Sequence, residues 1–157
     1  MEVEVKIRGL LIDPVTNQPI IVMQNLGGNA TLPIWIAPAE AQAIALELQK
    51  EVPPRPQTHD LIRNLLIGLD VSLVKVVVTE LKDSSFYSVL WLQRDGQLIS
   101  MDSRTSDAVA IALRMDCPIF VEDKVFKACL TQDEDSSAET KRWLEGLGDE
   151  DLGPYKM

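Results

Sequence analysis

Two stretches of this chain, one in each half, carry nearly the same pattern of small and aliphatic residues. Residues 40–48 read Glu-Ala-Gln-Ala-Ile-Ala-Leu-Glu-Leu, and residues 107–115 read Asp-Ala-Val-Ala-Ile-Ala-Leu-Arg-Met. At one fixed offset, Ala41, Ala43, Ile44, Ala45 and Leu46 recur as Ala108, Ala110, Ile111, Ala112 and Leu113. The register continues backward through a strand, a turn and a second strand, which predicts an internal duplication. Glu40 and Asp107 are then equivalent positions.

The first half predicts three strands and a helix. The strands, which are β-branched and bounded by turn signals, are expected over 2–13, 19–25 and 32–37. Helical spacing follows over 39–50, and Pro38 suits the first turn of that helix. A stiff, extended linker at 53–56 leads into a second helix over 58–69.

The second half repeats this order. Strands are expected over 71–81, 86–94, 97–101 and 118–121, and a helix over 106–115. The pair Asp95-Gly96 is a hairpin signal. We therefore predict an α+β fold in which internally duplicated β-β-β-α units form a mixed sheet with helices packed on it.

A separate C-terminal arm is expected beyond this unit. Ser136 to Glu139 read as a capping box, which predicts a helix over 136–147. Residues 131–157 hold three Lys/Arg against eight Asp/Glu, whereas residues 1–130 hold twelve against sixteen. We expect a domain at 1–130 and an acidic helical arm at 131–157.

Composition restricts the function classes. The chain of 157 residues is the length of one domain. Its net charge of −9 is unlike that of a basic nucleic-acid-binding module, so any DNA or RNA would bind weakly. Cys117 and Cys129 lie in apolar surroundings and are expected to be reduced. The acidic N-terminus and the lack of a long apolar run predict a cytoplasmic protein with no membrane segment.

The first polar motif is Pro-Arg-Pro-Gln-Thr-His-Asp at 54–60, which contains the one histidine of the chain. Two interpretations fit it. Thr58 suits an N-cap and Asp60 complements the helix dipole, which leaves His59 as a surface residue. Alternatively, His59 is a general base or metal ligand with Asp60 as its partner.

The second polar motif is Asp-Ser-Arg-Thr-Ser-Asp at 102–107. Thr105 or Ser106 can cap the following helix, and Asp107 can lie on its positive end. Capping does not account for Arg104 or for Asp102 at a strand end. The two carboxylates could hold Mg²⁺ while Arg104 contacts a phosphate; equally, Arg104 could be consumed by ion pairs with them.

These motifs, taken in order, resemble the bifunctional nuclease family over roughly residues 1–130. The matching segments are 32–36, 40–41, 43–45, 55–56, 58–61, 86–87, 102–104, 106–108, 110–114 and 118–121. Thr105 stands where relatives often have proline. The resemblance implies hydrolysis of DNA and RNA, an activity associated with plant members, and a homo-oligomer that is a dimer or larger. It transfers no catalytic residues.

The leading hypothesis is a metal-assisted phosphodiesterase acting on nucleic acid. His59, Asp60, Arg104 and Asp107 would be catalytic; Glu40, Asp102 and Asp107 would hold Mg²⁺ or Mn²⁺; and Arg55, Arg104 and Ser106 would bind substrate. This requires the two motifs to converge on one cavity. Two alternatives stay open: a non-enzymatic binding or regulatory module that assembles as an oligomer, and a hydrolase of a small phosphorylated metabolite.

Overall fold

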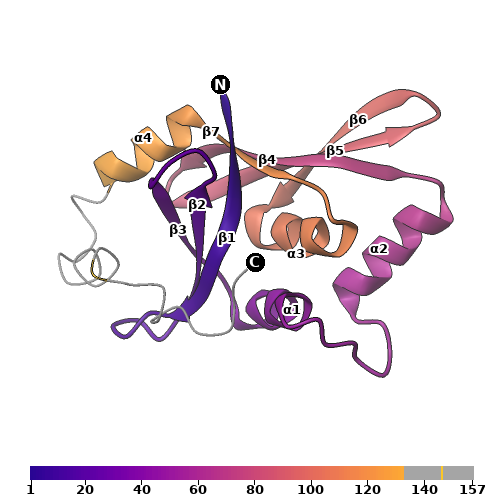
Figure 1. Ribbon diagram of the computed structural model, residues 1–157, viewed down its shortest axis with the longest axis horizontal. Coiled ribbons are helices and arrows are strands. Elements are labelled where there is room, and N and C mark those ends of the chain that lie inside the picture. The colour runs from indigo at the N-terminus through magenta and orange to yellow at the C-terminus, as the bar shows by residue number, and fades with distance from the viewer. Residues whose placement is uncertain (133–145, 147–157) are drawn as a thin grey trace.

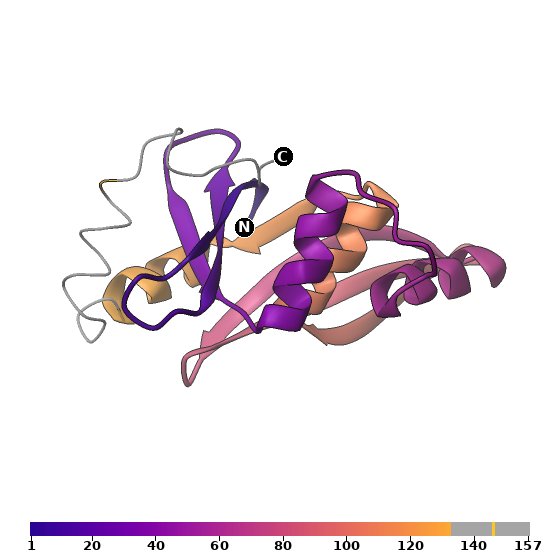
Figure 2. The same ribbon diagram turned by 90° about the horizontal axis from the view of Figure 1, so that it is seen from below.

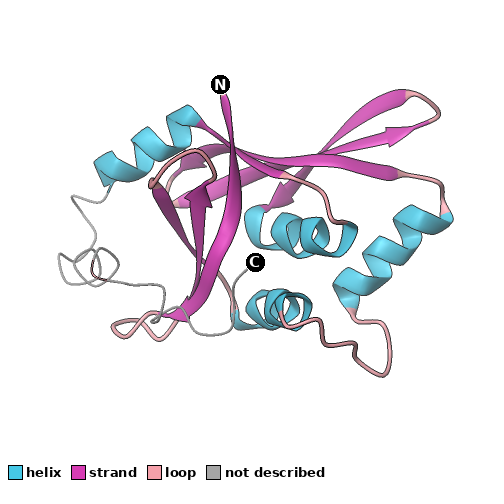
Figure 3. Ribbon diagram, viewed as in Figure 1, coloured by secondary structure: helices cyan, strands magenta, loops and turns pink. Residues whose placement is uncertain are grey.

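The computed structural model describes residues 1–132 and residue 146. The strands are β1 (Glu2–Ile12), β2 (Pro19–Asn25), β3 (Thr31–Trp35), β4 (Ser72–Lys82), β5 (Ser85–Arg94), β6 (Gln97–Arg104) and β7 (Ile119–Glu122). The helices are α1 (Pro38–Leu48), α2 (Thr58–Gly68), α3 (Thr105–Met115) and α4 (Asp123–Gln132). Figure 1 shows their arrangement, and Figure 3 separates strands from helices.

All seven strands form one mixed sheet in the order β3-β2-β1-β7-β4-β5-β6. Two antiparallel three-stranded units, β1 to β3 and β4 to β6, are joined through β7, which pairs antiparallel with β1 and parallel with β4. The parallel pairing is possible because α3 intervenes before β7, since parallel neighbours require a crossover connection. The predicted α+β class with a mixed sheet is confirmed.

The turns follow from local residue chemistry. Asp95 and Gly96 both have positive φ (51° and 77°), which suits the two-residue hairpin predicted between β5 and β6. Asp83 and Ser84 (φ 51° and 62°) make an equivalent turn between β4 and β5. Strand β6 runs from Gln97 to Arg104, beyond the predicted end at residue 101. Thr105, the next residue, is the first residue of α3.

Helices α1, α2 and α3 lie together on one side of the sheet, with α3 between the other two (Figure 2). Ala108, Ala110 and Ala112 of α3 are at most 1% exposed, because small side chains allow the helix backbone to approach the strands closely. Ile44 of α1 and Val76 of β4 belong to the same buried core. Helix α4 packs instead on β4 and β7.

Helix α4 was not predicted; it begins at Asp123 and continues through residues 130 and 131, and the division of the chain into a domain and an arm stays a prediction. The predicted helix over 136–147, and most of the predicted arm, lie outside the described residues. Among the helices described, none is long and apolar enough to cross a membrane.

Candidate functional site

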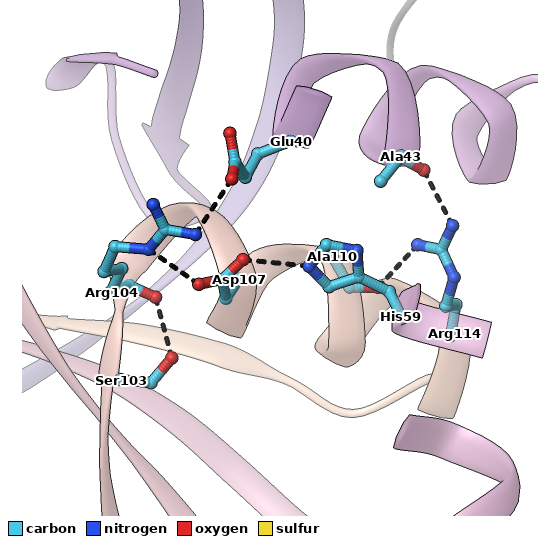
Figure 4. Close-up of polar contacts among 8 residues, drawn as sticks. All are labelled: Glu40, Ala43, His59, Ser103, Arg104, Asp107, Ala110 and Arg114. Carbon is cyan, nitrogen blue, oxygen red and sulfur yellow. Dashed lines mark hydrogen bonds and ion pairs between the residues drawn. The ribbon is translucent and has the colours of Figure 1, made fainter. Parts of the chain in front are cut away.

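The first turns of α1, α2 and α3 meet at one cleft of about 710 Å³. Glu40 and Ala43 come from α1, His59 from α2, and Asp107 from α3; the end of β6 supplies the remaining polar wall through Arg104. Figure 4 shows how these side chains point toward one another. A helix N-terminus carries partial positive charge and unpaired N–H groups, so three such ends around one cleft favour an anion there.

Each of these three helices has a carboxylate at its third residue. These residues are Glu40 in α1, Asp60 in α2 and Asp107 in α3. Only Asp60 closes a capping box: it accepts the backbone N–H of Gln57 (3.0 Å), which is the N-cap of α2. The other two carboxylates are turned toward the cleft, where they contact Arg104.

A continuous chain of polar contacts runs through the cleft. His59 Nε2 lies 2.9 Å from Asp107 Oδ1. Arg104 Nε donates to Asp107 Oδ2 at 2.8 Å. Arg104 Nη2 donates to Glu40 Oε1, also at 2.8 Å. The structure therefore brings the two polar motifs into direct contact through His59 and Asp107, which is the convergence that the nuclease hypothesis requires.

The ionisation of Asp107 fixes the state of His59. Burial raises the pKa of Asp107, but hydrogen bonds from Arg104 and His59 outweigh burial, so the pKa lies below that of an ordinary aspartate. At neutral pH the carboxylate is ionised and can only accept hydrogen bonds. His59 Nε2 must therefore carry the proton that it shares with Asp107. The lone pair of the neutral ring is then on Nδ1, which is the nitrogen able to act as a base.

Arg104 combines a fixed position with an exposed end. Hydrogen bonds to Asp107 and Glu40 raise the pKa of its guanidinium, so it remains charged. Its side chain is 66% exposed, and no acceptor among the described residues is bonded to Nη1. A fixed, solvent-facing guanidinium N–H pair is suited to a phosphate oxygen.

Arg114 holds the same three helices together behind the cleft. Its side chain is 2% exposed, and its Nε donates to Asp60 Oδ1 at 2.8 Å. Nη1 donates to the carbonyl of Ala110 in α3 and Nη2 to that of Ala43 in α1, both at 2.9 Å (Figure 4). The sequence prediction missed this residue, although an arginine two turns after Asp107 in an otherwise apolar helix is a detectable signal.

The structure assigns different surroundings to several predicted site residues. Asp60 contacts Arg114 and Gln57, and the carboxylate beside His59 is that of Asp107. Asp102 lines the cleft, exposed and without a side-chain ion pair to the described residues. Ser106 is buried in the first turn of α3 and does not line the cleft. Arg55 is exposed in the linker before α2 and is likewise absent from the lining.

The expected N-caps are also corrected. Gln57 caps α2, and Thr58 is the first helical residue. Arg104 occupies the N-cap position of α3 without a side-chain cap bond. The Thr105 hydroxyl is buried against that of Ser88 on β5 (2.5 Å). In both helices the cap lies one or two residues earlier than the polar pattern indicated. In α3 the reason is that the hydroxyl of Thr105 is bonded to Ser88 of the sheet.

The residues predicted to bind Mg²⁺ or Mn²⁺ do not fit a metal in this arrangement. Within the described part of the chain, no three His, Cys, Asp or Glu side chains are placed to share an ion. The Arg104 guanidinium stands between Glu40 and Asp107 and occupies one oxygen of each. Mg²⁺ needs several oxygen ligands around one centre, so it would have to displace Arg104. Glu40 Oε2 is buried with no hydrogen-bond partner.

Fold and site together define a class: an α+β domain whose cleft pairs an imidazole–carboxylate couple with an arginine. The model of the bifunctional nuclease domain matches residues 21–134, and the chain belongs to this family. An uncharacterised protein of Mycobacterium tuberculosis is 45% identical over 122 residues, which are 78% of this chain and 73% of that protein.

Plant proteins show a more distant similarity. Bifunctional nuclease 1 of Oryza sativa (subspecies indica) and bifunctional nuclease of Oryza minuta are each 26% identical over 118 residues. The match spans 73% of this chain and 36% of either plant protein. The family resemblance predicted from the sequence is confirmed.

Proposed function

We propose that this protein is a nuclease that hydrolyses phosphodiester bonds in DNA or RNA. One observation carries the proposal: Asp107 binds His59 through one oxygen and Arg104 through the other, inside a cleft where three helices begin. That arrangement supplies a base, a group that orients the base, and a cation at one place. The name of the plant relatives, bifunctional nuclease, supports the same reaction class.

In the proposed reaction, water attacks the phosphorus while His59 Nδ1 takes one of its protons. Asp107 holds the ring through Nε2–H and stabilises the imidazolium that forms. Arg104 Nη1 and the helix N-termini face the phosphate and stabilise the charge that grows on its oxygens. One P–O bond forms, the bond to the leaving oxygen breaks, and the imidazolium can return its proton to that oxygen.

The metal-assisted form expected from the sequence is a separate part of the proposal. It requires Glu40 and Asp107 to release Arg104 and to converge with Asp102 around Mg²⁺ or Mn²⁺. The steps above use only groups of the chain, so a chelator distinguishes the two forms.

The proposal is tested by incubating the full chain with single-stranded RNA and DNA in Mg²⁺, Mn²⁺ or EDTA. His59→Gln and Asp107→Asn are expected to lower the cleavage rate by about 10²–10⁴, the usual range for a general base. Arg104→Lys is expected to lower it by at least about tenfold, because lysine cannot reproduce the bidentate geometry.

The matched control is Arg94→Lys, since Arg94 is an exposed strand-end arginine outside the cleft. It should retain wild-type activity. Full activity in His59→Gln and Asp107→Asn would contradict the assigned roles. Cleavage abolished by EDTA and restored by Mn²⁺ would favour the metal-assisted form.

A binding or regulatory module is the second candidate. It is favoured by the charge of the cleft lining, which has three carboxylates and one arginine. That arginine, Arg104, is already paired with Glu40 and Asp107. Binding of nucleic acid without cleavage, at high protein concentration and in every metal condition, would support the module over the nuclease.

We propose that the protein is a homo-oligomer in either case. Helix α2 exposes Leu61 (54%) and Leu65 (53%), and Leu69 (55%), the C-cap residue directly after the helix, continues the same spacing to complete an apolar stripe. An apolar stripe of this kind is the usual surface for pairing with an equivalent helix of a second copy.

An internal duplication and a cytoplasmic location are proposed with it. Helices α1 and α3 have equal length and begin at equivalent positions of the repeat, Pro38 and Thr105, which supports the duplication. Cys117 and Cys129 are not joined in a disulfide, as is usual in a reducing compartment.

A further inference from the structure

We infer that the cleft binds a small phosphodiester that carries one negative charge and one or two nucleosides. Such a ligand is preferred to an internal phosphodiester of a long strand. This inference rests on the proposed phosphodiesterase activity and names the substrate class of the same cleft. It is carried by the charges, the apolar wall and the size of the cleft.

The charges around the cleft are the first observation. Its lining has three carboxylates, those of Glu40, Asp102 and Asp107, and Arg104 is its one arginine or lysine among the described residues. Two of the carboxylates are already paired with that arginine. Each additional phosphate of a long strand would meet an acidic lining without a counter-charge.

The capacity for anions is therefore about one phosphate. Arg104 has one terminal nitrogen, Nη1, not bonded to an acceptor within the described residues, and this end of the side chain is exposed. The first turns of α1, α2 and α3, which contribute to the cleft lining, add partial positive charge to it.

The apolar wall is the second observation. Ile62 of α2, Leu90 of β5, Met101 of β6 and Ile111 of α3 line the cleft beside the polar residues. Met101 is 50% exposed, and a flexible thioether makes favourable contacts with the flat face of an aromatic ring. A nucleobase attached to the bound phosphate can lie against this wall.

Size agrees with this assignment. A cleft of about 710 Å³ falls in the range of roughly 300–1,000 Å³ that encloses small organic ligands. Long nucleic acids are instead bound through many phosphates, which lysines and arginines neutralise together. Residues 1–130 hold twelve Lys/Arg against sixteen Asp/Glu, so the body of the protein is acidic.

The test compares thymidylyl-thymidine and uridylyl-uridine with long strands of dT and rU. The full chain is used, and kcat/KM is expressed per phosphodiester bond. The dinucleotides are expected to be hydrolysed at least as efficiently per bond as the long strands. Long-strand affinity should fall with salt at a log–log slope of about −0.7, the value for one phosphate contact on a single strand. A long strand cleaved about tenfold faster per bond, or a slope of about −3 or steeper, would overturn the inference.

A pair of variants tests the apolar wall. Met101→Ala is expected to raise KM for the dinucleotides about two- to twelvefold, the range for a sulfur–aromatic contact, and to leave kcat unchanged. Leu98→Ala is the matched control, because Leu98 is an exposed residue of the same strand three positions away and therefore faces the opposite side of the sheet. An unchanged KM in Met101→Ala, or equal effects in the two variants, would overturn the wall as a base-binding surface.

Failure of this inference is distinguishable from failure of the proposed function. If only long strands are cleaved, the proposed nuclease activity is supported and the inferred small substrate is contradicted. If isothermal titration calorimetry shows that the dinucleotides bind but no substrate is hydrolysed, the inferred ligand class is supported and the proposed nuclease activity is contradicted. If the dinucleotides are neither bound nor hydrolysed, the inference is overturned.

Discussion

His59 and Asp60 are neighbours in the sequence, yet their side chains serve different partners on α3. His59 contacts Asp107, and Asp60 contacts Arg114 two helical turns further along. The His59–Asp107 contact lies in the cleft and is partly buried, since the side chain of His59 is 11% exposed and that of Asp107 is 26% exposed. The other is buried, where an ion pair with a missing partner is costly.

The burial of Asp60 has a consequence for acid stability. Burial raises the pKa of its carboxyl, but the Gln57 N–H and the Arg114 guanidinium outweigh burial, and the folded-state pKa lies below the ordinary value of about 3.9. A lowered folded-state pKa stabilises the fold fully above the unfolded-state value. That stabilisation is lost as the pH falls through the folded-state pKa.

We therefore predict that wild type and Asp60→Asn differ most in unfolding free energy near neutral pH. The difference should shrink as the pH falls from about 4, where the carboxyl of the unfolded chain becomes protonated, through the lower pKa of the folded state. Urea titrations at both pH values measure it. Asp95→Asn, at an exposed hairpin residue, is the control. A wild-type advantage as large in strong acid as at neutral pH would contradict this assignment.

At the level of elements, one arginine joins three helices. Arg114 belongs to α3 and reaches α2 through Asp60 and α1 through the carbonyl of Ala43. The helices whose first turns form the cleft are thus fixed to one another at their interior side. Their mutual placement sets the distance between His59 and Asp107.

Arg114→Met is predicted to lower the unfolding free energy by about 3–5 kcal/mol, because Asp60 would be left as a buried, unpaired charge. Arg114→Met combined with Asp60→Leu should recover part of that loss, since the unpaired charge is removed. Denaturant unfolding of the two single variants and the double variant measures the coupling. Strictly additive losses would show that the two side chains do not act as a pair.

Most elements could be predicted from the sequence because their signals are local. A window of about ten residues is enough to predict the alternating or β-branched strands, the Asp95-Gly96 turn and the Ala-rich helices. Helix α4 was missed because it starts at Asp123, directly after β7, with no intervening loop or turn residue. Its apolar residues, at 125, 126 and 128–130, follow the charged pair Asp123-Lys124 and are interrupted by Lys127, so they do not form a clear helical period.

The site was predicted less completely than the fold. Its residue types and the meeting of the two motifs follow from polar groups at predicted helix starts. Which carboxylate pairs with which cation does not, because Asp60 and Asp107 occupy the same position in their helices. Only the packing of α2 on α3 decides that His59 meets Asp107 and that Arg114 meets Asp60.

At the scale of the whole molecule, the exposed apolar surface is uneven. Helix α2 covers the cleft side with its N-terminal turn, while Leu61, Leu65 and Leu69 face outward. The same helix thus positions His59 and carries the surface proposed for self-association. Pairing through this stripe would leave the side chain of His59 in the cleft of its own subunit.

We predict that wild type elutes as a dimer or larger species at micromolar concentration in size-exclusion chromatography with light scattering. Leu65→Lys should shift the protein to monomer, because a charge in the centre of the stripe would be buried without a partner. Val15→Lys, an equally exposed residue in the turn between β1 and β2, should not. A wild type that is monomeric throughout would contradict the proposed assembly.

Because the chain has one histidine and that histidine contacts Asp107 in the cleft, the protein contains its own spectroscopic probe. Its imidazole carbon-bound protons give isolated proton NMR signals that need no assignment by mutagenesis. Those signals report on the protonation of His59, on ligand binding in the cleft and on the rate of exchange between bound and free protein. They can be followed in unlabelled protein.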